Sequence, residues 1–202
     1  PLSTALLYAN HLGSDALTPD ERQKFATKTI ERLKKLEHLT NDMLRFVKGE
    51  TIQLENIIIS DLLAELQQVI EPQMMQHDLQ LIVHDHSQTE HLMTDHQALC
   101  SVMINLLENA MQASSPGDQI ILICNLEEEN IVLSVHDDGP GIDMALQERL
   151  FEPFFTTRSE GTGLGLAIVR GVIQSMGGSV QIHSLPDAGS EFVIRLPRNK
   201  GD

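Results

Sequence analysis

The chain has 202 residues, 41% of them hydrophobic, which is enough to bury the core of one large domain or of a domain with a smaller module. Asp and Glu outnumber Lys and Arg by 29 to 14, and the formal net charge of −15 argues against DNA or RNA as a partner. Neither a long apolar run nor a signal-peptide pattern occurs in the sequence, so we expect no membrane contact by this chain.

Residues 1–48 are expected to form two helices. The first covers 1–12, and the segment Thr18-Pro19-Asp20-Glu21 resembles a capping box that begins the second. Apolar residues then recur at helical spacing over 26–47. The apolar face of this long helix is too long to be buried by the one short helix before it. This pattern favours a helical-hairpin dimerisation module that forms a four-helix bundle in a homodimer. The alternative is a long helix packed on its own chain.

After residue 48 the pattern changes to alternating strands and helices. Ser60 and Asp61 are expected to cap one helix, and Asp95 to open another. Because the helices are segregated from a largely antiparallel sheet, the fold class is α+β, with an α/β sandwich over 49–202. The expected strands are 52–58, 79–83, 91–94, 119–126, 130–137, 179–184 and 191–196, and the expected helices are 60–75, 95–113 and 163–176.

The two cysteines, Cys100 and Cys124, lie in apolar surroundings without a CxxC spacing. We expect both thiols to be buried and reduced, with a role in packing. Reduced thiols are typical of a cytoplasmic protein, and that is the compartment we expect.

Four polar or glycine-rich segments interrupt the hydrophobic pattern, and the first contains Asn105 and Asn109 within a helix. Residues four apart share one helix face, so Leu106 and Leu107 turn toward the core beneath them. Two amide oxygens on one face can ligate a hard cation without adding charge. The alternative is a pair of solvated surface amides.

The second segment runs from Asp137 to Ile142 at the end of an expected strand. Its two glycines, Gly139 and Gly141, permit either close approach of a ligand or a positive φ. A carboxylate at this position can accept a hydrogen bond from the exocyclic amine of adenine. The alternative is a tight turn without a ligand.

The third segment, from Phe151 to Arg158, holds three of the six phenylalanines, followed by two threonines and an arginine. Such a stretch suits a lid anchored by aromatic rings, in which Arg158 neutralises a phosphate. The alternative is a core cluster beside a surface arginine.

The fourth segment, from Gly161 to Leu166, opens the helix expected over 163–176. Backbone N–H groups at a helix N-terminus form an anion site, and glycines allow a ligand to come close. The glycine spacing does not match the Rossmann fingerprint, and the P-loop pattern is absent from the sequence.

In their joint order these segments resemble the N, G1, F and G2 boxes of the GHKL ATPase and kinase superfamily, in its sensor histidine kinase version. Gly177-Gly178 and Gly189-Ser190-Glu191-Phe192 fit the end of the same pattern, and Pro1-Leu2-Ser3 resembles the stretch after the histidine of an H-box. The segment Phe151–Thr157 is similar to the nitrogen-regulatory branch. The first fifty residues are most similar to kinases that control polar flagella.

The resemblance implies ATP and Mg²⁺ as cofactors. Asn109 would coordinate Mg²⁺ with Asn105 beside it, and Asp137 would bind the adenine amine. Asn105, Asn109 and Arg158 would form the catalytic set, and Ser190 would support a water on the base. The remaining cofactor-binding residues implied by the resemblance are Ala113, Gly139, Gly141, Ile142, Thr157, Gly161, Thr162, Gly163, Leu164, Gly165 and Leu166.

The implied reaction moves the γ-phosphoryl group of ATP to a histidine and then to an aspartate of a response regulator. In the family pattern the acceptor histidine lies five residues before the proline that matches Pro1, so we expect this chain to bind ATP without phosphorylating itself. His11 and His38 are alternative acceptors, but neither has the flanking pattern of an H-box.

Two other functions stay open at this point. Other GHKL ATPases and kinases typically use a glutamate base one helical turn before the metal-binding asparagine, where this sequence has Asn105, and that difference favours phosphotransfer over hydrolysis. A dimeric adaptor with a vestigial nucleotide site is the non-enzymatic alternative.

Overall fold

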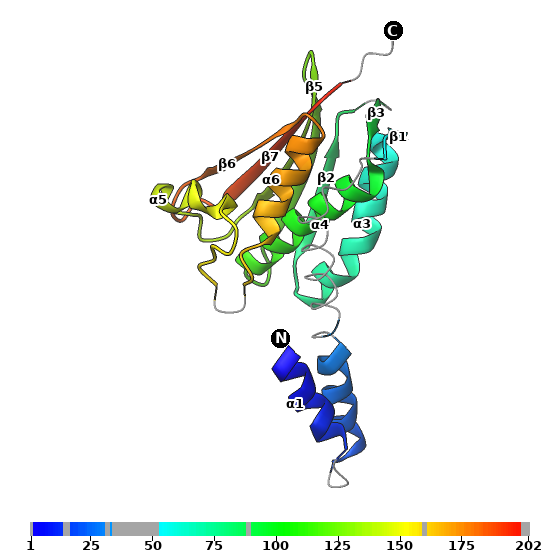
Figure 1. Cartoon of the computed structure of the whole chain (residues 1–202), viewed down its shortest axis with the longest axis vertical. Coiled ribbons are helices and arrows are strands. Elements are labelled where there is room, and N and C mark those ends of the chain that lie inside the picture. The colour runs from blue at the N-terminus through cyan, green and yellow to red at the C-terminus, as the bar shows by residue number, and fades with distance from the viewer. Residues whose placement is uncertain are drawn as a thin grey trace. The chain divides into compact units, whose positions relative to one another are not determined.

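The computed structural model describes residues 2–13, 17–30, 33, 53–87, 90–158 and 161–198. The chain divides into two compact units, Pro1–Gly49 and Glu50–Asp202. Figure 1 shows the helices of the first unit in blue and the mixed second unit in cyan to red. Among the described helices, none is both long and apolar enough to cross a membrane.

The first unit contains α1 (Leu2–Leu12) and a second helical stretch over 19–30. The predicted capping box is confirmed, because the backbone N–H of Thr18 donates to Glu21 Oε2 at 2.9 Å and that of Glu21 donates back to Thr18 Oγ1 at 3.3 Å. The His11 ring stacks on the Phe25 ring with centroids 5.3 Å apart, so the two helices meet at these rings.

The rest of the helix expected up to residue 48, including His38, lies outside the described residues apart from Leu33. The four-helix bundle of a homodimer therefore stays a prediction.

The second unit contains a five-stranded sheet in the order β2-β4-β5-β7-β6 and a separate antiparallel pair, β1 with β3. Among the described strands only the pairing of β2 with β4 is parallel, so the prediction of a largely antiparallel sheet is confirmed. The strands are β1 (Glu55–Ile58), β2 (Gln80–Asp85), β3 (His91–Thr94), β4 (Gln119–Leu126), β5 (Asn130–Asp137), β6 (Ser179–Ser184) and β7 (Ser190–Pro197). The helices are α3 (Ile59–Gln76), α4 (His96–Ala113), α5 (Met144–Gln147) and α6 (Gly165–Ser175), with a 3₁₀ turn at Arg149–Phe151.

The three long helices cover one face of the sheet (Figure 1), where α3 packs on β2, α4 on β4 and β5, and α6 on β6. Alternate residues of β4 point into this layer, and Ile120, Leu122 and Cys124 are fully buried. This core fixes where β5 ends, and the polar segment from Asp137 to Ile142 follows directly from that end.

Some local predictions were wrong. Ser60 and Asp61 do not cap α3, which begins one residue earlier and whose N-cap, Ile58, makes no side-chain hydrogen bond. The reason is tertiary, because the N–H of Ile59 donates to the carbonyl of Glu90 at 3.1 Å. The short α5 and the 3₁₀ turn were not predicted, since neither is long enough to show a hydrophobic period.

Two other local predictions are confirmed. The Asp95 side chain caps α4 by accepting from the N–H of Ala98 at 2.9 Å. Cys100 and Cys124 are both buried and outside any disulfide.

Candidate functional site

The paired asparagines are partly buried and lie on the face of α4 that is turned away from the core. Asn109 Nδ2 donates to Asn105 Oδ1 at 3.0 Å, while Leu106 and Leu107 are fully buried beneath. This hydrogen bond turns the amide nitrogen of Asn109 toward Asn105 and its oxygen away. The Asn109 oxygen is therefore oriented as the acceptor that can reach a cation in front of the helix.

The start of α6 packs directly against this pair. A Cβ atom on Gly165 would lie 2.7 Å from Asn105 Oδ1, so a larger residue at this position would displace the Asn105 amide. The N-cap residue Leu164 makes no side-chain hydrogen bond to the first turn of α6. The first-turn N–H groups of α6 therefore point beside the asparagines without a side-chain cap, which is the arrangement that binds anions.

Asp137 lies at the end of β5 and is only 2% exposed. Burial raises the pKa of this carboxyl, and hydrogen bonds from the backbone N–H groups of Gly139 and Ser190 oppose that shift together with the charges of His136 and Arg158. The N–H of Gly139 donates to Asp137 Oδ1 at 3.0 Å. A buried carboxylate held in this way is an acceptor for an amine of a ligand.

The glycine-rich loop after Asp137 is fastened to the turn between β6 and β7. The N–H of Gly189 donates to the carbonyl of Gly139 at 3.1 Å, and the N–H of Asp187 donates to the carbonyl of Pro140 at 2.8 Å. Gly141 has a φ of +69°, and a Cβ atom there would run into a backbone carbonyl of the same turn. The glycine at position 141 thus serves backbone packing.

Side chains from β6 and α5 complete this region, and sequence reasoning missed them. Ser184 Oγ accepts from the N–H of Ile142 at 2.8 Å and lies 3.1 Å from Ser190 Oγ. Gln147 Nε2 donates to the carbonyl oxygens of Ile142 and Ser184, at 2.9 and 2.8 Å. A polar residue at the end of the strand paired with Ser190 is the signal that could have identified Ser184.

Arg158 connects the loop segment to α4. Its guanidinium donates to Gln112 Oε1 at 2.8 Å and to the backbone oxygen of Asn109 at 3.3 Å. The same side chain interacts electrostatically with Asp137. A Cβ atom on Gly139 would lie 2.9 Å from the carbonyl oxygen of Ala113. The C-terminal end of α4, Arg158 and the end of β5 therefore converge on one region.

The phenylalanine segment is only partly an anchor. Phe151 and Phe155 are partly buried, and the Arg149 guanidinium lies 4.2 Å from the centroid of the Phe155 ring. Phe154 is 69% exposed with a φ of +68°, so this ring is not an anchor, and the lid predicted for this segment stays a prediction. Its N–H donates to the carbonyl of Gly163 at 2.8 Å, which ties the segment to the start of α6.

The remaining predicted residues differ in exposure. Thr157 and Gly161 are exposed, whereas Leu164 is buried and Leu166 packs partly against the core. Thr162 Oγ1 accepts from the N–H of Leu164 at 3.4 Å. In this segment, therefore, it is the backbone rather than the leucine side chains that faces the predicted site.

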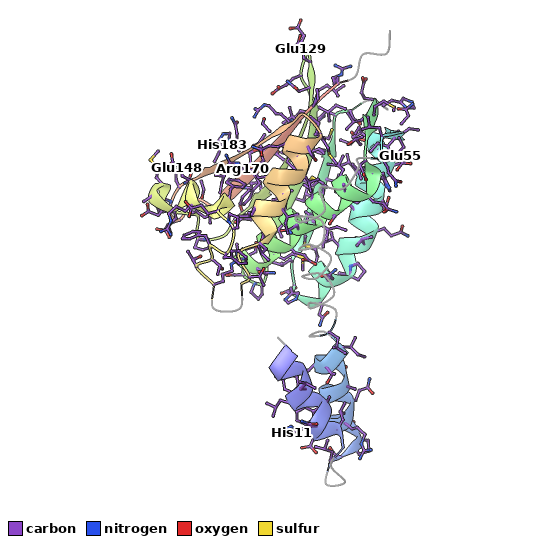
Figure 2. The ribbon with its side chains drawn as sticks, in the orientation of Figure 1. His11, Glu55, Glu129, Glu148, Arg170 and His183 are labelled. Atoms are coloured by element: carbon purple, nitrogen blue, oxygen red, sulfur yellow. The ribbon has the colours of Figure 1, made fainter. Side chains whose placement is uncertain are left out.

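A hollow of about 670 Å³ lies elsewhere on this unit, between the end of α5, α6 and the edge strand β6. Figure 2 labels three of its lining residues, Glu148, Arg170 and His183. None of the predicted site residues lines this hollow, although Gln147, which bonds to Ile142 and Ser184 at the site, also borders the hollow.

Comparisons with known proteins were consistent with one another. The model of the family "Histidine kinase-, DNA gyrase B-, and HSP90-like ATPase" matches residues 94–200. The sensor protein kinase FleS of Pseudomonas aeruginosa is 39% identical over 197 residues, which cover 98% of this chain and 48% of FleS.

Two solved structures are also similar. The catalytic domain of the histidine kinase ThkA has a TM-score of 0.68 and 26% identity, over 72% of this chain and 96% of that domain. Full-length ShkA in complex with AMPPNP has a TM-score of 0.77 and 25% identity, over 96% of this chain and 42% of ShkA. The chain thus spans about half the length of the curated relatives that it matches.

Proposed function

This chain belongs to the histidine kinase-, DNA gyrase B- and HSP90-like ATPase family, and on that premise we propose that it is the catalytic core of a two-component sensor histidine kinase of the nitrogen-regulatory and polar-flagellar type. The observation that carries the proposal is the convergence of a buried carboxylate, Asp137, with the amide of Asn109 and the uncapped start of α6. These three groups match the base, the metal and the phosphates of one magnesium nucleotide.

At the base end, Asp137 accepts the exocyclic amine of adenine. Gly139, Gly141 and Ile142 form the wall of this pocket, and Ala113 closes it from α4, supported by the close approach of Gly139 to the Ala113 carbonyl. Ser190 holds a water on the same base, and Ser184 supports Ser190 through the 3.1 Å contact between their hydroxyl oxygens. Adenine fits this end because its exocyclic amine brings an N–H donor to the buried carboxylate of Asp137.

At the phosphate end, Asn109 ligates Mg²⁺ through its amide oxygen, with Asn105 orienting it through their hydrogen bond. Arg158 and the backbone from Gly161 to Leu166 neutralise the triphosphate charge, with Thr157 alongside. The formal net charge of −15 makes these local cations and dipoles necessary, because the rest of the surface repels a nucleotide.

Bound Mg-ATP would supply the γ-phosphoryl group, and the residues of this chain would supply position and charge. Arg158 is held by Gln112 and by the backbone of Asn109, so its guanidinium is fixed beside the proposed metal ligand, where it can stabilise negative charge. The residue one turn before Asn109 is Asn105 and not a glutamate, which favours phosphotransfer over hydrolysis.

The helical unit completes the proposal. Leu6, Leu7, Ile30 and Leu33 are exposed on its helices, which suits burial against a second copy in a four-helix bundle. We place the phosphoacceptor histidine in the part of the longer protein that precedes Pro1. The next acceptor is an aspartate of a response-regulator receiver domain docked on the helices. His11 is a poor substitute, since its Nδ1 lies 2.8 Å from the carbonyl oxygen of Leu7 and its ring stacks on Phe25.

The variant Asp137→Asn tests the base end, because the amide presents a donor to adenine in place of a second acceptor. We expect its affinity for AMPPNP in the presence of Mg²⁺, measured by calorimetry, to fall roughly 10- to 100-fold. Asp138→Asn is the matched control, because the neighbouring carboxylate is exposed and lies 3.4 Å from His136. Equal affinity in the Asp137 variant and the wild-type chain would reject the site, and rapid steady ATP hydrolysis by the wild-type chain would favour the ATPase alternative.

A further inference from the structure

Three potential metal ligands meet where α3 passes the first turns of α4. Glu65 comes from α3, and His96 and Cys100 lie four residues apart on α4. His96 Nε2 lies 2.8 Å from Glu65 Oε2 and 3.6 Å from Cys100 Sγ. All three ligand atoms lie within 4.8 Å of one another, so one ring nitrogen faces both of the other ligands.

The spacing suits a tetrahedral transition-metal ion. Bonds of about 2.3 Å to sulfur and about 2.0 Å to nitrogen and oxygen place tetrahedral ligands about 3.6 Å apart for sulfur and nitrogen, and about 3.3 Å apart for nitrogen and oxygen. The sulfur–nitrogen distance already has this value, and the nitrogen–oxygen distance needs to open by about half an ångström. A rotation of the exposed Glu65 side chain provides that movement.

The cluster is buried on the side of Cys100 and open to solvent on the side of His96 and Glu65. Cys100 is 9% exposed, whereas the side chains of His96 and Glu65 are 29% and 48% exposed. An ion can therefore enter from solvent, and water can complete its coordination. The strongly negative chain also favours the approach of a cation.

We propose that Glu65, His96 and Cys100 bind a divalent transition-metal ion of the Zn²⁺ class, with water as the fourth ligand. Thiolate and imidazole are ligands of such ions, whereas Mg²⁺ prefers oxygen, so this site is distinct from the amide pair at Asn105 and Asn109. Because the ligands come from two helices, the ion would clamp α3 to α4. This inference does not rest on the proposed kinase activity.

Metal binding also displaces a proton. Ligation converts the buried Cys100 thiol to a thiolate and releases its proton to solvent. The thiolate–metal bond is therefore the signature of this site.

The test is a Co²⁺ titration of the whole chain, followed by the thiolate-to-metal absorption band. We expect one equivalent of Co²⁺ to produce the band, Zn²⁺ to displace it, and Cys100→Ser to abolish it. Cys124→Ser is the matched control, because Cys124 is also buried and outside any disulfide. A wild-type chain without the band, or a band that is lost equally in both variants, would overturn the proposal.

A second variant guards against a folding defect in Cys100→Ser. His96→Gln changes a partly exposed side chain, and we expect at least tenfold weaker Zn²⁺ binding with an unchanged circular dichroism spectrum. The exposed pair His84 and His86, whose rings stack 6.3 Å apart on and just after β2, is the control for adventitious binding. If replacing that pair removes Zn²⁺ binding and His96→Gln does not, the ion binds at the surface histidines and the proposal fails.

Discussion

The two ends of the proposed nucleotide site are built differently. At the base end, Asp137 is buried, and the loop after it is bonded to the turn between β6 and β7 by backbone and serine hydrogen bonds. At the phosphate end, Thr157, Arg158 and Gly161 are exposed, and the first turn of α6 lacks a side-chain cap.

This contrast separates recognition of the ligand by its shape from recognition by its charge. The base end satisfies its polar groups within the protein, so it is preformed and selects a ligand by fit. The phosphate end offers N–H groups and a cation, so its strength depends on the charge that a ligand brings. We expect changes at the base end to affect folding as well as binding, and changes of the exposed side chains Thr157 and Arg158 at the phosphate end to affect binding alone.

The largest effect is expected at Gly141. Its positive φ and the carbonyl oxygen of Leu185 leave no room for a methyl group, so Gly141→Ala should lower the free energy of unfolding by about 2–5 kcal/mol in urea titrations. Gly171→Ala is the matched control, since a Cβ atom on this residue of α6 meets no atom within 4 Å. That variant should gain roughly 0.5–1 kcal/mol. Similar stability of the two variants would contradict the tight packing of the base end.

An intermediate effect is expected at Arg158. Arg158→Gln removes the cation at the phosphate end, so affinity for AMPPNP should fall roughly 10- to 100-fold while affinity for adenosine stays the same. Arg170→Gln removes the same charge beside the separate hollow, and we expect it to bind both ligands normally. Calorimetry with the two ligands measures the difference. Equal loss of adenosine and AMPPNP would show that Arg158 shapes the base end as well.

The smallest effect is expected from a change of pH. Burial raises the pKa of Asp137 above its ordinary value of 3.8, so the folded chain binds this proton more tightly than the unfolded chain. The contribution of this carboxyl to the free energy of unfolding is therefore fully present below pH 3.8 and is lost as pH rises through the raised pKa. The wild-type chain should lose stability relative to Asp137→Asn as pH increases from about 4 to about 7 in urea titrations. A constant difference would mean that the carboxylate is well solvated.

Much of the fold was predictable, because the hydrophobic periodicity and the length of an element depend on residues that are neighbours in the sequence. The strands 119–126 and 130–137 have the predicted bounds, and Asp95 caps α4 as its sequence position indicates. The start of α3 was not predictable, because its first N–H is bonded to Glu90, thirty-one residues along the chain from Ile59. Pairings of that kind carry no local signal.

The site shows the same division. Order and spacing predicted the segments of Asn109, Asp137 and Gly165, and the structure brings all three together. Gln112 and Ser184 were missed, because each acts through a partner that is far away in sequence. The outward position of Phe154 was missed as well, since it depends on a positive φ set by the backbone hydrogen bond to Gly163.

The two hairpin turns of the main sheet differ in how much change they can tolerate. The turn that joins β4 to β5 ends at Glu129, at the tip of that hairpin in Figure 2 and at the opposite end of β5 from Asp137. The turn between β6 and β7 leads into Ser190 opposite Asp137, and an added residue there would disturb the hydrogen bonds of Asp187 and Gly189 to the loop after Asp137. A fluorophore or an affinity tag therefore belongs at Glu128, where it would leave the nucleotide pocket intact, and natural length variation should accumulate at that same tip.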